Sequence, residues 1–249
     1  MAVVTGGASG IGQATCERFV DLGWQVVAAD LAPVGSRARA ASDAVLEVQA
    51  DVTDAADITR LVEFTTERFG RVDAVVTSAG IARNAPVRDT TPDEFRRTLE
   101  VNLVATFAVV RAFVDLLAAD GGGSVVTISS VSGLRGSQDR AAYSASKGGV
   151  VALTSQLAFE LADEAIRVNC VAPGSTLTPL AQKAQDPQAK KAILQSIPLH
   201  RYAQPAEIAE VVTFLAGQGS GFVTGQTWTV DGGQSIGAGW RVPKGGHDV

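Results

Sequence analysis

The 249-residue chain has few of the residues that build disulfide frameworks and metal centres, with only two cysteines, Cys16 and Cys170, and two histidines, His200 and His247. Two cysteines are too few for a disulfide framework, and neither the cysteines nor the histidines show the spacing of metal ligands. Each cysteine lies in a segment with apolar neighbours, so we expect small buried thiols. The sequence therefore predicts no metal site.

Positive charge and long apolar runs are also scarce. The 21 lysines and arginines are outnumbered by 26 acidic residues, the net charge is −5, and no basic run occurs. Nucleic-acid binding depends on a basic surface, so we expect no nucleic-acid partner. No uninterrupted apolar run approaches the roughly 18 residues of a membrane span, and Met1 leads directly into a predicted strand. We therefore expect a soluble, cytoplasmic protein with no membrane partner.

What the chain does contain is a regular alternation of strand-like and helix-like segments. The alternation is typical of a parallel sheet with right-handed crossovers. It predicts an α/β fold, a single Rossmann-type domain over residues 1–249, doubly wound, with seven parallel strands and helices on both faces. The predicted strands are Met1–Val4, Trp24–Asp30, Val45–Ala50, Val72–Val76, Ser124–Ser129, Arg167–Ala172 and Thr227–Val230. The main predicted helices are Gln13–Leu22, Ala55–Phe69, Pro92–Ala119, Tyr143–Asp163 and Ala206–Ala216.

Tyr143 and Lys147 are four residues apart in one of these helices, which places them on the same face, one turn apart. A nearby ammonium favours the phenolate, so we expect Lys147 to lower the pKa of Tyr143 and let it exchange a proton with an alcohol or ketone. Ser130 follows a predicted buried strand, at the sheet edge where α/β folds bind ligands. Taken alone, the pair is better explained as an exposed aromatic ring and a solvated charge on a helix.

A glycine-rich turn follows the first predicted strand and reads Thr-Gly-Gly-Ala-Ser-Gly-Ile-Gly from Thr5 to Gly12. Glycines at 6, 10 and 12 allow a tight turn and a close approach of the backbone to a pyrophosphate, with the first N–H groups of the next helix facing the phosphates. The spacing differs from GxGxxG. A glycine-rich segment of this kind can also be a plain turn.

Asp30 ends the second predicted strand, twenty residues after Gly10. A carboxylate at this place can bond both ribose hydroxyls of an adenosine and repels a 2′-phosphate, so we expect NAD rather than NADP as the cofactor. A turn or helix-capping aspartate is the alternative. Arg37 and Arg39 follow closely and leave the choice between the two cofactors open.

Together these motifs resemble those of the classical short-chain dehydrogenase/reductase family over essentially the whole chain. Asp51-Val52, Ala79-Gly80, Val101-Asn102-Leu103, Pro173-Gly174 and Asp231-Gly232-Gly233 occur in the family's order. The resemblance implies an active-site set of Asn102, Ser130, Tyr143 and Lys147. It also implies cofactor contacts from Gly6, Ser9, Gly10, Ile11, Gly12, Asp30, Leu31, Asp51, Val52, Ala79, Gly80, Tyr143, Lys147, Pro173, Gly174, Thr176 and Thr178.

Asn102 lies in an otherwise apolar helical run from Thr98 to Val110, where an unpaired amide would cost about 1–3 kcal/mol. The resemblance implies a local distortion of the helix and a water that links Asn102 to Lys147. A structural amide that pairs with a neighbouring backbone group is the alternative.

The implied function is NAD-dependent interconversion of a secondary alcohol and a ketone in a homotetramer, in which Ser130 binds the substrate oxygen and Tyr143 transfers its proton. One alternative is an NADPH-dependent 3-oxoacyl-[acyl-carrier-protein] reductase, which resembles this chain less because Gly121 and Ala165 stand where such enzymes tend to have basic residues. A non-catalytic cofactor-binding regulator is another.

Three loops are expected to cover the site, from Ile81 to Thr90, from Gly133 to Arg140 and from Ser175 to His200, the last resembling a helical lid. They carry basic residues that could attract an anionic substrate, although exposed loops are commonly charged for solubility alone. These residues are Arg83, Arg135, Arg140, Lys183, Lys190 and Lys191.

Overall fold

One parallel sheet of seven strands forms the centre of the molecule in the computed structural model, which describes residues 1–35, 43–182 and 187–237. The strands lie in the order β3-β2-β1-β4-β5-β6-β7. Strands are added toward one edge of the sheet from β1 to β3 and toward the other edge from β4 to β7, so the order reverses between β1 and β4. The predicted α/β fold with seven parallel strands is therefore confirmed. The strands are β1 (Ala2–Thr5), β2 (Val26–Asp30), β3 (Val45–Gln49), β4 (Ala74–Thr77), β5 (Ser124–Ile128), β6 (Arg167–Pro173) and β7 (Thr227–Val230).

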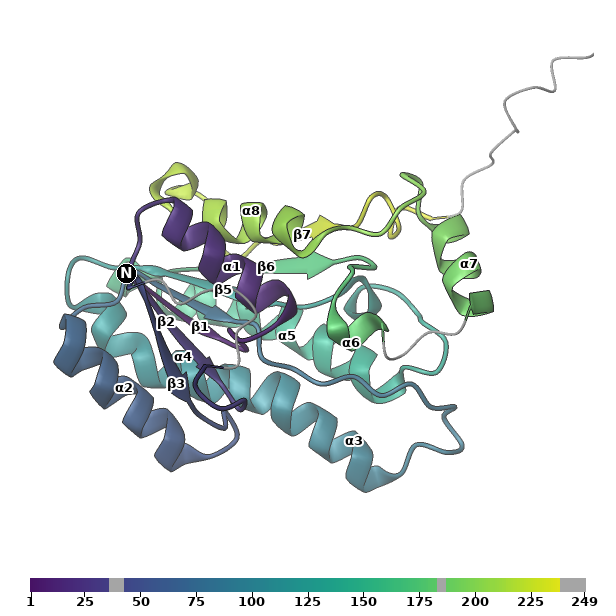
Figure 1. Ribbon diagram of the computed structural model, residues 1–249, viewed down its shortest axis with the longest axis horizontal. Helices are drawn as coiled ribbons and strands as arrows, with labels where there is room; N and C mark the ends of the chain where they lie inside the picture. The colour runs from purple at the N-terminus through teal and green to yellow at the C-terminus, as the bar shows by residue number, and fades with distance from the viewer. Residues whose placement is uncertain (36–42, 183–186, 238–249) are drawn as a thin grey trace, which may run out of the picture.

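Helices cover both faces of this sheet (Figure 1). On one face α1 (Gly10–Asp21) and α8 (Pro205–Ala216) pack on the sheet through residues such as Phe19 and Leu215. On the other face lie α2 (Ala55–Phe69), α4 (Ala105–Ala118) and α5 (Ala141–Glu160), with Phe113 among their buried residues. Because both faces are covered, β1, β2, β4, β5 and β6 are buried almost throughout, which explains why they read as continuous apolar runs.

Capping residues set where several helices begin and end. The side chain of Asp54 accepts hydrogen bonds from Ala56 N and Asp57 N at the start of α2, and Gly70 closes that helix in the left-handed conformation. Thr91 and Glu94 form a capping box at the start of α3 (Pro92–Leu99). At the first helix, Ser9 is extended and α1 starts at Gly10, three residues before the predicted start, so its free N–H groups lie directly after the glycine turn.

The helix predicted from Pro92 to Ala119 changes type in the middle, with the π-helix η1 (Glu100–Val104) between α3 and α4. By length and composition, Pro92–Ala118 is apolar enough to cross a membrane, which the sequence expectation missed because it considered uninterrupted apolar runs only. Core helices of soluble proteins pass the same test, and Val109, Phe113 and Leu117 of α4 are fully buried in the core.

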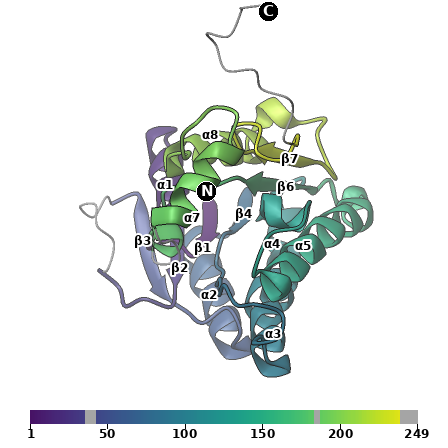
Figure 2. The same cartoon turned by 90° about the vertical axis from the view of Figure 1, so that its right-hand side faces the viewer.

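The carboxyl ends of the strands form the edge that faces the viewer in Figure 2. Two short helices, α6 (Pro179–Gln182) and α7 (Pro187–Ser196), lie at this edge after β6. They belong to the segment expected to cover the site. Lys183, Arg37, Arg39 and His247 lie outside the described residues.

Candidate active site

A cavity of about 880 Å³ opens at the carboxyl ends of the strands. Its size is in the range of small-molecule and cofactor sites. Most of the residues predicted for the site line it. They are Gly6, Ser9, Gly10, Ile11, Asp30, Leu31, Asp51, Val52, Ala79, Gly80, Ser130, Tyr143, Lys147, Pro173, Gly174, Thr176 and Thr178. Gly12 and Asn102 are the two predicted residues that do not line it.

The glycine turn brings three chain segments into close contact. Gly6 has a positive φ of 67°, and a Cβ atom there would lie 2.8 Å from the backbone nitrogen of Ala79. A Cβ atom at Gly12 would lie 2.1 Å from the carbonyl oxygen of Gly6. Gly12 therefore packs α1 onto the turn, while Gly6 and Gly10 shape the cavity wall.

Asp30 and Asp51 form what we call the adenosine end of the cavity, and backbone groups hold both carboxylates. Asp30 accepts hydrogen bonds from Ala8 N at 2.9 Å and Ala32 N at 3.0 Å. Asp51 accepts from Thr53 N at 2.8 Å and from the Thr53 hydroxyl at 2.7 Å, and these bonds lower the pKa of Asp51. These hydrogen bonds fix both side chains in place before any ligand arrives, and the lowered pKa keeps Asp51 ionised near neutral pH.

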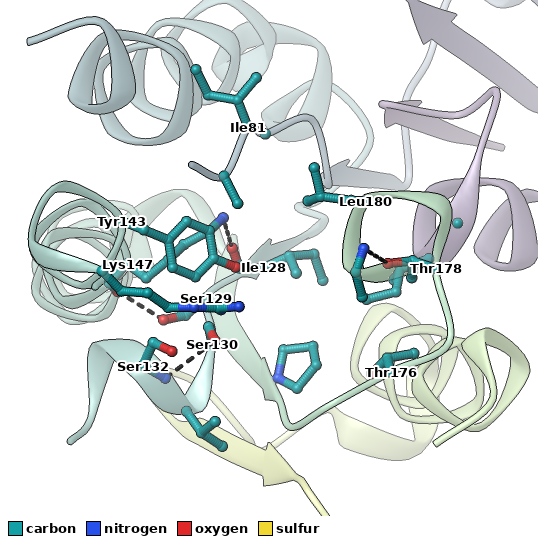
Figure 3. A pocket seen from close by; sticks show the side chains of 18 of the residues that line it. Ile81, Ile128, Ser129, Ser130, Ser132, Tyr143, Lys147, Thr176, Thr178 and Leu180 are labelled. Carbon is teal, nitrogen blue, oxygen red and sulfur yellow. Dashed lines mark hydrogen bonds between the residues drawn. The ribbon is translucent and has the colours of Figure 1, made fainter. Parts of the chain in front are cut away.

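Ser130, Tyr143 and Lys147 converge on the cavity from β5 and α5 (Figure 3). Tyr143 and Lys147 share one face of α5, and the Lys147 Nζ lies 5.9 Å from the centre of the Tyr143 ring. Lys147 donates a 2.8 Å hydrogen bond to the carbonyl of Ile128, the last residue of β5. Ser130 Oγ accepts from Ser132 N at 3.1 Å. The two elements therefore hold the three groups in one fixed cluster.

The lowered pKa that we expected for Tyr143 is not found. Burial raises the pKa of Tyr143, and the hydrogen bond with Ser130 and the positive charge of Arg140 only partly oppose this effect. Lys147 does not lower it, since Lys147 is buried itself and its pKa falls from 10.5 to about 8. Burial disfavours the charged form of both groups, and this effect outweighs their proximity.

Asn102 lies fully buried in the π-helix, behind the cavity wall. Its amide accepts from Ile81 N at 2.8 Å and donates to Ile81 O and to Ser146 Oγ, each at 3.0 Å. The helix is thus distorted at Asn102, as the family resemblance implied. The Asn102 amide also pairs with a nearby backbone group, which was the alternative. A Cβ atom on Gly80 would lie 3.1 Å from Asn102 Oδ1 and 3.6 Å from Lys147 Nζ, so both groups adjoin Gly80. The water between them stays a prediction.

Sequence reasoning missed Gln234, a buried residue that lines the cavity. Its Oε1 accepts from the backbone and hydroxyl of Ser175, and its Nε2 donates to Ser196 Oγ at the end of α7 at 3.1 Å. Gln234 thereby ties the loop after β6 to α7. Its position directly after Asp231-Gly232-Gly233 was the available signal.

The basic residues of the covering loops separate into two groups. Arg135 and Arg140 line the cavity, while Arg83 forms an ion pair with Glu94. Lys190 and Lys191 are exposed and do not line it. Across residues 1–35, 43–182 and 187–237, no group of three or more His, Cys, Asp or Glu residues could hold a metal ion.

Known proteins resemble this chain over nearly its whole length. A family profile described as enoyl-(acyl carrier protein) reductase matches residues 6–235. The chain is 37% identical over 241 residues to 3-oxoacyl-[acyl-carrier-protein] reductase FabG of Thermotoga maritima, covering 95% of this chain and 98% of that protein. It is 38% identical over 248 residues to trans-4-hydroxycyclohexanecarboxylate dehydrogenase of Sinomonas cyclohexanicum, covering 95% and 93%.

Among solved structures, that of levodione reductase matches with a TM-score of 0.90 at 35% identity, covering 95% of this chain and 98% of the other. Sequence and fold thus both match these proteins over nearly the whole chain. The chain belongs to the short-chain dehydrogenase/reductase family and is an oxidoreductase that acts on an alcohol or a ketone.

Proposed function

We propose that the protein interconverts a secondary alcohol and a ketone with NAD as the cofactor. The observation that carries this proposal is that Ser130, Tyr143 and Lys147 line the same cavity as Asp30. A proton-transferring cluster and a carboxylate suited to an adenosine ribose therefore share one binding space. Oxidation of the alcohol is the proposed direction, because cellular NAD pools favour it, and the cytoplasm is the proposed location.

The shape and the donors of the cavity fit a dinucleotide. The glycine turn and the N–H groups that open α1 would hold the pyrophosphate, Asp30 the adenosine ribose, and Asp51 with Val52 the adenine. Pro173, Gly174, Thr176 and Thr178 would lie on the nicotinamide side. When bound, the nicotinamide supplies the hydride chemistry, and the protein supplies orientation and electrostatics.

The proton chemistry follows from how the three cluster residues are bonded. The Ser132 N–H donates to Ser130 Oγ, so the Ser130 hydroxyl keeps its own proton to donate, either to Tyr143 or to a substrate oxygen. Tyr143 accepts the hydroxyl proton of an alcohol or donates one to a ketone. Lys147 is anchored on Ile128 O and keeps a positive charge below its pKa of about 8. Burial raises the pKa of Tyr143, so the protonated phenol is favoured near neutral pH and the phenolate forms on the alkaline side.

NAD is proposed over NADP on the charge at the adenosine end. Asp30 and Glu47 both line a small hollow beside the Asp30 carboxylate, so a 2′-phosphate would meet two negative charges. This argument counts against the alternative of an NADPH-dependent 3-oxoacyl-[acyl-carrier-protein] reductase. The Thermotoga relative is named as a 3-oxoacyl-[acyl-carrier-protein] reductase. The 4-hydroxycyclohexanecarboxylate dehydrogenase relative favours a dehydrogenase of a small cyclic alcohol instead.

We also propose a homotetramer, because two separate faces expose large apolar side chains. Phe107 on α4 and Phe159 on α5 are 44% and 84% exposed on one face. Phe214 and Trp228 stack on another face at a ring-centre distance of 5.6 Å and are both exposed. Two self-complementary contacts per subunit generate a closed tetramer. Light scattering at low protein concentration tests this, and a stable monomer would contradict it.

The test of the function is an activity screen on secondary alcohols and ketones with NAD(H) and NADP(H), following the absorbance of the reduced nicotinamide. We expect turnover with a secondary alcohol and NAD. Turnover with NADPH alone on an acyl-carrier-protein substrate would favour the reductase. Tight NAD binding with no turnover on any substrate would favour a regulatory protein.

A further inference from the structure

We propose that the substrate carries a carboxylate and that Arg140 binds it, with Arg135 as a second cation. This inference rests on the proposed alcohol and ketone chemistry and names its substrate class, a hydroxy acid or keto acid. The residues that carry it form what we call the substrate end of the cavity, made of Arg135, Arg140 and Tyr143.

Arg140 lies beside the proton-transferring phenol. It precedes α5 at the capping position, and its carbonyl accepts a 2.7 Å hydrogen bond from Ser144 N. Its guanidinium carbon lies 5.4 Å from the centre of the Tyr143 ring. Arg140 is partly buried and lines the cavity. A substrate whose oxygen meets Tyr143 thus has a positive charge close to the remainder of the molecule.

No carboxylate of the described chain pairs with this charge. Neither Arg135 nor Arg140 has an acidic group within the 4.0 Å of an ion pair, whereas Arg83, also in a covering loop, pairs with Glu94. Asp139 is the acidic lining residue next to Arg140 in the chain, and it is not within ion-pair distance of either arginine. A partly buried guanidinium without a counter-ion is a site that a carboxylate can bind through two parallel hydrogen bonds.

The other two cations that line the cavity, Lys147 and Arg97, act elsewhere, so Arg140 is available to bind a substrate carboxylate. Lys147 donates to Ile128 O, and Arg97 lies near enough to Asp51 to lower the pKa of that carboxyl. Lys147 is thus hydrogen-bonded at the centre of the cavity, and the charge of Arg97 acts on the adenosine end rather than on the substrate end. Because Arg140 lies against the Tyr143 ring, the carboxylate of the substrate has to be separated from its reacting carbon by only a few bonds.

The experiment compares matched substrates that differ in charge alone. Each hydroxy acid, such as 3-hydroxybutanoate or 4-hydroxycyclohexanecarboxylate, is assayed beside its carboxamide, and the ratio of their kcat/KM values is measured for the unmodified enzyme, Arg140→Gln, Arg140→Lys and Arg83→Gln. We expect the acid to be preferred by about ten- to a hundredfold in the unmodified enzyme and in Arg83→Gln. The preference should nearly vanish in Arg140→Gln and be partly kept in Arg140→Lys, which retains the charge without the planar fork.

A ratio near one in the unmodified enzyme, or an unchanged ratio in Arg140→Gln, would overturn the inference. Calorimetry on the NADH-loaded enzyme with cyclohexanecarboxylate and cyclohexanecarboxamide gives an answer that does not depend on turnover. Equal binding of the two probes also overturns the inference. If no acid or amide is oxidised with either cofactor while the carboxylate still binds better through Arg140, the proposed reaction fails and the anion site stands.

Discussion

The adenosine end and the substrate end of the cavity differ in sign of charge and in how that charge is bonded. At the adenosine end, Asp30 and Asp51 accept two hydrogen bonds each from neighbouring residues. At the substrate end, Arg135 and Arg140 have no ion pair with any described residue. The cofactor is the same in every turnover, so the protein can hold the groups that bind it in place with its own hydrogen bonds. The arginines at the substrate end have no such partner, and their charge is available to bind the substrate.

The largest effect on activity is expected at the substrate end, from substitution of Tyr143. Tyr143→Phe removes the proton donor but keeps the ring beneath Arg140, so kcat/KM should fall by about 10²- to 10⁴-fold. NAD binding and the preference for a carboxylate over an amide in binding should both persist. Steady-state kinetics and calorimetry measure the two properties. Substantial activity in this variant would show that another group carries the proton.

The next effect is on stability: burying Lys147, which is 5% exposed, should make the free energy of unfolding depend on pH. Its pKa is about 8 in the folded protein and 10.5 ordinarily, so the unfolded chain binds more protons between these values. Stability therefore rises with pH across this window, by about 3 kcal/mol from this group. Urea unfolding at several pH values should show the rise in the unmodified protein relative to Lys147→Met. Parallel curves for the two proteins would contradict a buried lysine with a lowered pKa.

At the adenosine end, Asp30→Ala should weaken NAD binding by about ten- to a hundredfold and reduce the preference for NAD over NADP. The cause is the loss of a preorganised carboxylate that bonds the ribose and repels a 2′-phosphate. Dissociation constants for both cofactors measure this. Asp43→Ala is the control, since Asp43 is exposed and does not line the cavity. Equal affinity for NAD and NADP in the unmodified protein would remove the assigned role of Asp30.

The smallest effect is the pH dependence of the rate. Burial raises the pKa of Tyr143, and oxidation needs the phenolate, so kcat/KM for oxidation should rise by about tenfold per pH unit toward the alkaline side. Ketone reduction needs the protonated phenol and should fall there. His200→Ala should leave both limbs in place, because His200 does not line the cavity. Loss of the oxidation limb in that variant would transfer the proton role to His200.

The sequence determined the fold and most of the lining of the cavity because these depend on local patterns. The boundaries of α2 and β7 match their predicted ranges, and the alternation of strands and helices predicted the seven parallel strands. The i,i+4 spacing of Tyr143 and Lys147 put them on one helix face, as predicted. Of the predicted site residues, Gly12 and Asn102 do not line the cavity, and each supports a lining segment from behind.

Only the tertiary structure decided the partners and charge states of these residues. Asn102 pairs with Ile81, and Gln234 with Ser175 across 59 positions of the chain, and no local pattern encodes such contacts. The shift of the Tyr143 pKa was predicted in the wrong direction, because the sequence shows the neighbouring lysine but not how far folding removes both groups from water. Whether Arg83 or Arg140 stays unpaired was likewise settled by which carboxylate the folded chain brings near. Burial and long-range pairing are properties of the packed chain, and they set the energy of every charge in the site.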